Sequence, residues 1–340
     1  MNNAKQATKR PSAIWLRLLP GLLVSVAAIA ALVAFVDLSE VQKAFSQVEL
    51  IPALPLVVAL FLGTVGARAM AWRTTLQEQP SFRDSFFVLN QGYLLNNILP
   101  FRLGELGRAL LLGGRTGLSF WRVLPSIVVE RLFDLGFAAI LLFSSLPYVI
   151  GAEFASTSGV VAVSAVVIVF VVLFVMATRP AWVLRAANFT TRPWPKFQAW
   201  VEVQLGHFLE GLSSLKEPAR FLRIALWMLL TWVFNLAWYY TLLRVFFGEA
   251  TWLWASFSIA VASVGVALPS TPSYIGVLEV ALVGSLSLLG ADESVALAYA
   301  LVAHVIYFVV TAILGIIGFW QQGQSLGSIY NQLLSRSEAK

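Results

Sequence analysis

Cysteine and charged residues are the two things this sequence most lacks. None of its 340 residues is cysteine, which excludes disulfide bonds, iron–sulfur clusters and thiolate zinc sites. Only 12% of the residues are charged, against about 25% in a typical soluble domain, and 59% are hydrophobic. Several apolar runs of about 18 residues or more predict membrane-spanning helices. We therefore expect an all-α, polytopic membrane helical bundle.

Motifs of familiar catalytic chemistry are also missing. The chain has no HExxH, Asp-x-Asp or Walker sequence. It also has no paired histidine and carboxylate groups at metal-ligand spacing. We therefore expect no metal, no cofactor and no enzymatic activity.

Six hydrophobic segments are long enough for full crossings. With proline, glycine and charge as boundaries, they lie near residues 16–36, 51–72, 123–147, 159–178, 222–246 and 294–320. The prediction is a single transmembrane domain over residues 16–322, with tails at 1–15 and 323–340.

Two further hydrophobic segments are interrupted by proline. Residues 85–115 contain Pro100, and residues 252–290 contain Pro269 and Pro272. Each half is short for a crossing, so each segment is predicted to be a re-entrant helical hairpin. Additional tilted spans are the alternative.

The distribution of Lys and Arg predicts the orientation. The first 17 residues include four basic residues and no acidic one, and basic residues gather again over 179–223. Cytoplasmic loops are enriched in Lys and Arg, so both termini are predicted on the cytoplasmic side of an inner membrane. The net charge of +6 and pI of 9.7 then follow from topology, and no nucleic-acid partner is expected.

An amphipathic pattern occupies residues 196–216. Apolar side chains recur there at helical spacing with Lys and Glu between them, which predicts a helix on the cytoplasmic membrane surface. Such a helix either packs and anchors the protein or docks a partner, such as a membrane-associated glycosyltransferase or lipid synthase.

The two interrupted segments share a pattern of proline, glycine and acid. It reads Pro100, Gly104 and Glu105 in the first, and Pro272, Gly276 and Glu279 in the second. In transporters, such breaks in two corresponding halves mark a binding site, because half-helix N-termini direct N–H groups at an anion. We expect an inverted repeat whose hairpin tips meet.

Six ionisable residues lie in or beside hydrophobic segments, where each would cost about 2.5–3.5 kcal/mol in lipid. They are Arg102, Glu105, Arg108, Glu130, Arg131 and Asp134. Guanidinium groups match phosphate oxygens bidentately, so the three arginines predict a phosphate headgroup site. The three carboxylates balance them, and a phosphate could replace one carboxylate.

The hairpin tips add polar and small residues to this predicted site. They are Asn97, Gly104, Ser270, Thr271 and Gly276. The polar side chains could bind sugar or glycerol hydroxyls, or satisfy backbone groups freed by the prolines.

A purely structural role is the alternative for the charged residues. Arg131 and Asp134 are three apart, as are Glu105 and Arg108, so each pair could form an ion pair along one helix. Glu279 is either a proton-titrating switch or a partner for one of the arginines, while Glu105, Glu130 and Asp134 are further sites for proton coupling. His304 is expected to be a hydrogen-bonded contact between helices.

These motifs carry a family resemblance. Asn97-x-x-Pro100-x-Arg102-x-Gly104-Glu105-x-x-Arg108, Glu130-Arg131-x-x-Asp134 and Pro269-Ser270-Thr271-Pro272 followed by Gly276-Val277-x-Glu279 occur in this order. Over about residues 15–325 the chain resembles the lysylphosphatidylglycerol synthase transmembrane family, which includes the flippase half of the multiple peptide resistance factor. The resemblance implies a helical bundle that moves a lipid headgroup between leaflets. The charged residues that it implies for the site are Arg102, Glu105, Arg108, Glu130, Arg131, Asp134 and Glu279. Members often have Pro-Gly-Gly where this chain has Pro272-Ser273-Tyr274.

The expected function is a flippase-like transporter for a phosphate-bearing lipid, either a phospholipid or a polyprenyl-phosphate-linked sugar. The alternative is a non-catalytic scaffold or accessory subunit for a glycosyltransferase or lipid-modifying enzyme.

Overall fold

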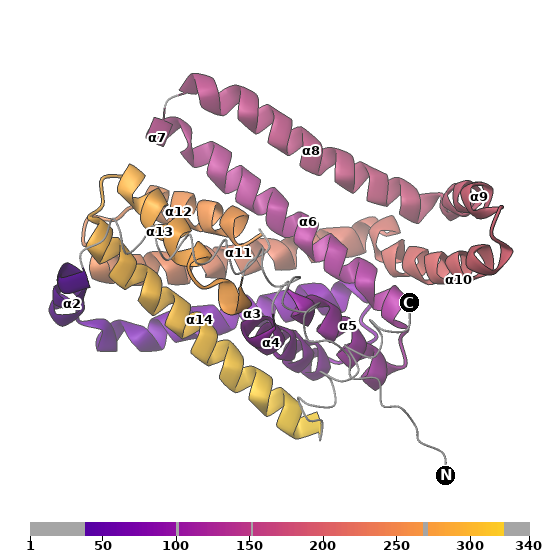
Figure 1. Ribbon diagram of the computed structural model, residues 1–340, viewed down its shortest axis with the longest axis horizontal. Helices are drawn as coiled ribbons and strands as arrows, with labels where there is room; N and C mark the ends of the chain where they lie inside the picture. Colours follow the sequence, from indigo (N-terminus) through magenta and orange to yellow (C-terminus); the bar gives the residue numbers. More distant parts are fainter. Residues whose placement is uncertain (1–37, 100–101, 151, 268–270, 323–340) are drawn as a thin grey trace, which may run out of the picture.

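The described part of the chain is built from helices. A computed structural model describes residues 38–99, 102–150, 152–267 and 271–322. Its main helices are α2 (Leu38–Gln47), α3 (Leu50–Thr75), α4 (Phe82–Ile98), α5 (Leu103–Thr116), α6 (Phe120–Ser145), α8 (Ala152–Thr178), α9 (Pro180–Thr191), α10 (Pro195–Gly211), α11 (Pro218–Phe246), α12 (Trp252–Gly265), α13 (Val277–Leu288) and α14 (Glu293–Gln322) (Figure 1). Short turns form α7 (Pro147–Ile150), η1 (Leu212–Lys216) and η2 (Pro272–Tyr274). The prediction of an all-α protein is confirmed.

Long helices occupy most of the predicted crossings. Helices α3, α8, α11 and α14 cover the predicted segments 51–72, 159–178, 222–246 and 294–320, and α6 covers all but the last two residues of 123–147. The predicted segment 16–36 and both terminal tails lie outside the described residues. Their helical state and orientation therefore stay predictions.

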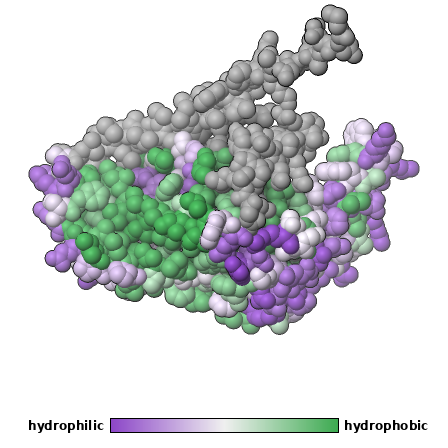
Figure 2. Space-filling model, turned by 90° about the horizontal axis from the view of Figure 1, so that it is seen from below, coloured by the Kyte–Doolittle hydropathy of each residue, from purple (hydrophilic) through white to green (hydrophobic). Residues whose placement is uncertain are grey.

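Three of these helices, α3, α11 and α14, are long and apolar enough to cross a membrane. A fourth span is counted in the described residues if α8 and α9 are taken together as one bent pair. Figure 2 shows a broad hydrophobic face, with hydrophilic residues at both of its ends. The chain is thus a multi-pass membrane protein.

A sharp bend separates α8 from the connection that follows it. Helices α8 and α9 meet at 93°, and α9, α10 and α11 all begin with proline, which is favourable in the first helical turn. The predicted amphipathic segment 196–216 forms α10 and η1. Leu209, Leu212 and Leu215 are buried in a core with α6 and α8, whereas Phe197 and Trp200 at the start of α10 are exposed.

Both interrupted segments fold as helix–break–helix hairpins. The first hairpin consists of α4 and α5, which pack on each other, and the second consists of α12, η2 and α13. The first hairpin contacts α3, α6 and α14, and the second contacts α6, α11 and α14. Element η2 lies against α4, so the second break lies beside the first hairpin, while the re-entrant form of both hairpins stays a prediction. An inverted repeat stays a prediction.

Glycines allow the first hairpin to approach α14 closely. A Cβ atom on Gly315 would lie 2.7 Å from Cβ of Leu94 and 2.8 Å from the carbonyl oxygen of Asn90. Gly318 is similarly close to Phe87 and Gln91. This face of α14 therefore packs on α4 within the chain.

Candidate functional site

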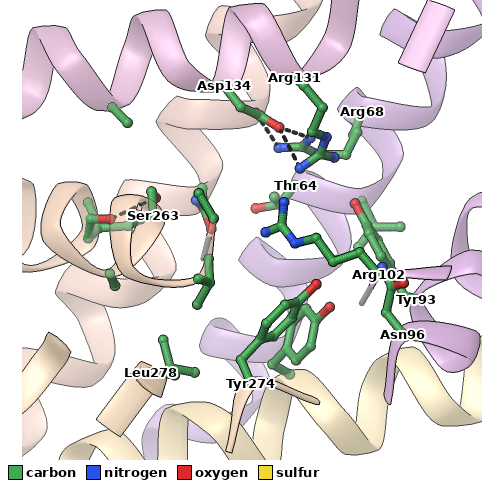
Figure 3. A pocket seen from close by; sticks show the side chains of 18 of the residues that line it. Thr64, Arg68, Tyr93, Asn96, Arg102, Arg131, Asp134, Ser263, Tyr274 and Leu278 are labelled. Carbon is green, nitrogen blue, oxygen red and sulfur yellow. Dashed lines mark hydrogen bonds and ion pairs between the residues drawn. The ribbon is translucent and has the colours of Figure 1, made fainter. Parts of the chain in front are cut away.

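A cavity of about 360 Å³ lies between the two hairpins, with walls from α3, α6, α11 and α14. One wall is charged. It contains Arg68, Arg102, Glu105, Arg108, Arg131 and Asp134. The remaining walls are mainly apolar and aromatic, and we call the cavity the arginine chamber (Figure 3).

Two carboxylates of α6 organise the ion pairs that we call the inner side of the chamber, where Asp134 lines the cavity and Glu130 does not. Asp134 accepts two parallel hydrogen bonds of 2.8 Å from Arg68 of α3, and a third of 3.2 Å from Nε1 of Trp232. Glu130 accepts hydrogen bonds from Arg68 at 2.9 Å and from Arg131 at 2.8 Å. Because these are charge-assisted bonds between buried groups, they fix α3 firmly to α6.

Arg108 of α5 completes the inner side. Its Nη2 lies 3.0 Å from Oε2 of Glu130, and its guanidinium lies over the ring of Trp72 at 5.0 Å from the ring centroid. Trp72 in turn donates a 2.8 Å hydrogen bond to Ser126 of α6. The first hairpin is thereby joined to both α3 and α6.

Glu105 is held much more loosely than the other two carboxylates. Its Oε1 lies 3.6 Å from Nη1 of Arg102 and 3.6 Å from Nε of Arg131. Both distances exceed that of a good hydrogen bond. Nε of Arg102 and Nε of Arg131 are buried without a hydrogen-bond partner among the described residues. The outer side of the chamber therefore has donor capacity that the protein itself does not fill.

The seven charged residues form one ion-pair network with an excess positive charge. Four arginines face three carboxylates, the members being Arg68, Arg102, Glu105, Arg108, Glu130, Arg131 and Asp134. The predicted neutral set of three against three was wrong because it omitted Arg68. This arginine lies within the apolar run predicted as the crossing 51–72, and an arginine inside such a run was the signal that could have identified it.

The expected pairs along single helices are only half correct. Arg131 and Asp134 do pair at 3.1 Å, but Arg108 reaches across to Glu130, and Glu105 lies between Arg102 and Arg131. Most contacts of the network therefore join different helices.

Arg102 projects into the middle of the chamber (Figure 3). It precedes α5 with a left-handed backbone, φ +55° and ψ +32°. Its guanidinium lies 5.3 Å from the ring centroid of Tyr274 in η2, a distance typical of a cation–π contact. Ser273 and Tyr274 are also left-handed, with φ of +57° and +62°. The two breaks thus meet through residues in a conformation that favours glycine.

At the two breaks, backbone N–H groups at the helix starts donate hydrogen bonds to the protein's own side chains. The N–H of Gly104 donates to Oδ1 of Asn96 at 2.8 Å, and that of Gly276 donates to Oε2 of Glu279 at 2.8 Å. These two N–H groups are not free for an anion, contrary to the expectation for both glycines. Gly104 has a packing role instead, because a Cβ atom there would lie 2.0 Å from the carbonyl oxygen of Gly92.

Other predicted residues lie outside the chamber wall. Asn97 donates to Thr311 at 3.0 Å, and Thr271 donates to the carbonyl oxygen of Ile275 at 3.3 Å. Glu279 contacts His304, so its partner is a histidine and not one of the arginines. Ser270 is outside the described residues.

The lysylphosphatidylglycerol synthase TM region family model matches residues 19–315. The chain belongs to this family. No curated protein and no solved structure matches it.

One departure from the expected family pattern has a structural explanation. Where the resemblance implies Pro-Gly-Gly, Ser273 and Tyr274 keep the left-handed backbone that glycine adopts easily. The substitution therefore leaves the path of the break compatible with glycine and adds an aromatic ring to the chamber wall.

Proposed function

We propose that this family member moves a lipid with an anionic, phosphate-bearing headgroup between the leaflets of the cytoplasmic membrane, without covalent chemistry. The observation that carries the proposal is the excess positive charge of the ion-pair network at a cavity inside a membrane protein. An unbalanced charge away from water is costly, and one negative headgroup would balance it.

Glu105 is the carboxylate that the headgroup displaces. It makes only the two 3.6 Å contacts with Arg102 and Arg131, whereas Glu130 and Asp134 are held by hydrogen bonds of 2.8–2.9 Å from Arg68 and Arg131. A phosphate between Arg102 and Arg131 would give both guanidinium groups a bidentate acceptor. The inner pairs would stay intact as a rigid support.

The size and lining of the chamber favour a headgroup over a whole lipid. About 360 Å³ lies near the lower end of ligand cavities, which run from roughly 300 to 1,000 Å³. The aromatic and apolar wall includes Trp232, Trp238 and Tyr274, which suits the carbon face of a glycerol or sugar. The acyl or polyprenyl chains would stay in the bilayer.

In this proposal α6 also crosses the membrane and the two hairpins are re-entrant. Helix α6 has 26 residues, so at 1.5 Å per residue it exceeds the roughly 30 Å hydrocarbon core. Its charged residues Glu130, Arg131 and Asp134 take part in the ion-pair network, so they do not oppose a crossing as they would in lipid. Access would alternate by movement of the hairpins around the chamber.

The test is transbilayer movement of fluorescent phosphatidylglycerol in proteoliposomes, with phosphatidylcholine as a zwitterionic comparison. The wild type should accelerate phosphatidylglycerol movement above protein-free liposomes, and Arg102→Gln should lower that rate by about tenfold or more, since a charge-assisted hydrogen bond contributes about 1.5–3 kcal/mol. Arg223→Gln is the matched control, because the Arg223 side chain is 50% exposed and pairs with Glu78 away from the chamber.

A second variant tests the exchange itself. Glu105→Gln removes the competing carboxylate, so phosphatidylglycerol should bind more tightly to the purified variant than to the wild type. Phosphatidylglycerol movement with the wild type no faster than in protein-free liposomes would contradict the proposal. A scaffold would instead tolerate Arg102→Gln and co-purify with a lipid-modifying enzyme.

A further inference from the structure

A second polar cluster lies beside the chamber, at the break of the second hairpin. His304 of α14 is in hydrogen-bond contact with Oε1 of Glu279 through Nδ1, and with Oγ of Ser273 at 2.9 Å through Nε2. Ser273, Glu279 and His304 are 2%, 5% and 8% exposed. The cluster reaches the first hairpin, because Oγ of Ser273 is 3.4 Å from Oδ1 of Asn97.

The positions of the hydrogens in this cluster are strongly constrained. Oε2 of Glu279 accepts the N–H of Gly276 at 2.8 Å, which favours the ionised carboxylate. An ionised Glu279 requires a hydrogen on Nδ1 of His304. The serine hydroxyl has a single hydrogen, and it faces two acceptors, Nε2 of His304 and Oδ1 of Asn97.

The protonation of Nε2 decides which acceptor receives that hydrogen. When His304 is neutral, Nε2 is bare and takes the hydroxyl hydrogen, so Asn97 loses its bond to the second hairpin. When His304 is protonated, Nε2–H donates to Oγ and the hydroxyl hydrogen turns to Asn97. One proton therefore adds a hydrogen bond between the two breaks.

We propose that Ser273, His304 and Glu279 form a proton-binding site whose occupancy joins the tip of the second hairpin to the first. The proton binds at Nε2 of His304 and is released from the same atom. Its coupling to lipid movement rests on the proposed function, whereas the proton site itself does not.

Imidazole is the side chain whose ordinary change of charge falls between about pH 5 and pH 8. Among the described residues, Tyr239 of α11 interacts electrostatically with Glu279, and Tyr299 of α14 donates to the carbonyl oxygen of Tyr239. Tyr274 follows Ser273 and has Arg102 against its ring, and Tyr307, three residues after His304, packs on Tyr93 of α4. Tyrosine and arginine ordinarily change charge only at about pH 10 or above. Glu279 contacts the N–H of Gly276 and the imidazole of His304.

The same three residue types act as nucleophile, base and orienting acid in hydrolases. Ser273 is only 2% exposed and does not line the arginine chamber. Both ring nitrogens of His304 are also engaged by Glu279 and Ser273 within the protein. The arrangement therefore favours proton binding over attack on a substrate.

The absence of cysteine makes the distance between the two breaks measurable with site-specific spin labels. Ile98→Cys and Ile275→Cys place one label beside each break, at side chains that are 51% and 49% exposed. We expect the distance distribution to become narrower and shorter between pH 8 and pH 5. His304→Gln should abolish this response, because glutamine does not bind a proton in this range.

Two variants make the experiment decisive. His207→Gln removes the only other histidine, which is 41% exposed on α10 and near Glu210, and it should leave the response unchanged. Ser273→Gly should abolish the response while suiting the left-handed backbone, so it covers the case in which His304→Gln does not fold. The proposal is overturned if the label-to-label distance in the doubly labelled parent does not change with pH. It is also overturned if His304→Gln or Ser273→Gly retains that pH response.

Lipid movement in the same pH range separates this inference from the proposed function. A pH-dependent distance without lipid movement would leave the proton site standing and remove the transporter. Lipid movement with a pH-independent distance would support the transporter and overturn the proton site.

Discussion

Removing Arg68 is the perturbation whose outcome the structure specifies most sharply. Arg68 makes three charge-assisted hydrogen bonds of 2.8–2.9 Å to Asp134 and Glu130. The side chains of Arg68, Glu130 and Asp134 are 10%, 3% and 15% exposed. We predict that Arg68→Met lowers the free energy of unfolding by about 3–5 kcal/mol, as expected when one partner of a buried ion pair is removed.

The magnitude follows from what each carboxylate retains. Glu130 would keep Arg108 and Arg131, and Asp134 would keep Arg131 and Trp232. Neither is left alone, so the loss stays within the range for one buried partner. At an effective dielectric constant of about 20, an ion pair at 4 Å contributes about 4 kcal/mol, which agrees with this estimate.

The measurement is the free energy of unfolding in detergent micelles or bicelles. Arg223→Met is the matched control, since its ion pair with Glu78 is exposed and should contribute less than about 1 kcal/mol. Adding Asp134→Leu to Arg68→Met should recover part of the loss, because it removes the carboxylate that lost most partners. Equal losses for Arg68→Met and Arg223→Met would refute the reasoning.

The other predictions concern close packing and the chamber wall. Gly104→Ala should abolish or greatly lower the folded yield, because its Cβ would lie 2.0 Å from the Gly92 carbonyl oxygen, while Gly114→Ala in the same helix meets nothing within 4 Å and should fold normally in size-exclusion chromatography. Gly315→Ala should lower the thermal unfolding midpoint through its clash with Leu94, and Gly284→Ala, with open space around it, should not. Tyr274→Gly should weaken phosphatidylglycerol binding about two- to thirtyfold by removing about 0.5–2 kcal/mol of cation–π contact with Arg102, whereas Tyr274→Phe should retain most of the affinity.

Hydropathy alone predicted the helices well, because long apolar runs have few alternatives to helix in a membrane. The predicted interruptions were also found, because α4 ends at Ile98 and α12 ends at Gly265, and a second helix follows each of them. Proline favours such an interruption because it removes a backbone donor. The tilt and membrane depth of these hairpins are set by packing, which no local pattern encodes.

Six of the seven charged residues of the candidate site were predicted from the sequence, but most of their pairing was not. The spacing of Glu105 and Arg108 favoured a contact along one helix, yet Arg108 pairs with Glu130 because α5 packs on α6. Arg68 was not predicted as a site residue, because the hydrophobic run around it indicated only a membrane-spanning helix. The partnership of Glu279 with His304 joins residues 25 positions apart on different helices, and only the tertiary fold could reveal it.

The left-handed backbone at Arg102, Ser273 and Tyr274 has an energetic consequence for any rearrangement of the hairpins. Each non-glycine residue in this conformation costs roughly 1–2 kcal/mol, and the cost persists only while surrounding contacts hold the residue there. Separation of the tips would let all three relax, so bulky residues here bias the equilibrium toward the parted arrangement. Glycines at these points would favour the joined arrangement and slow its release.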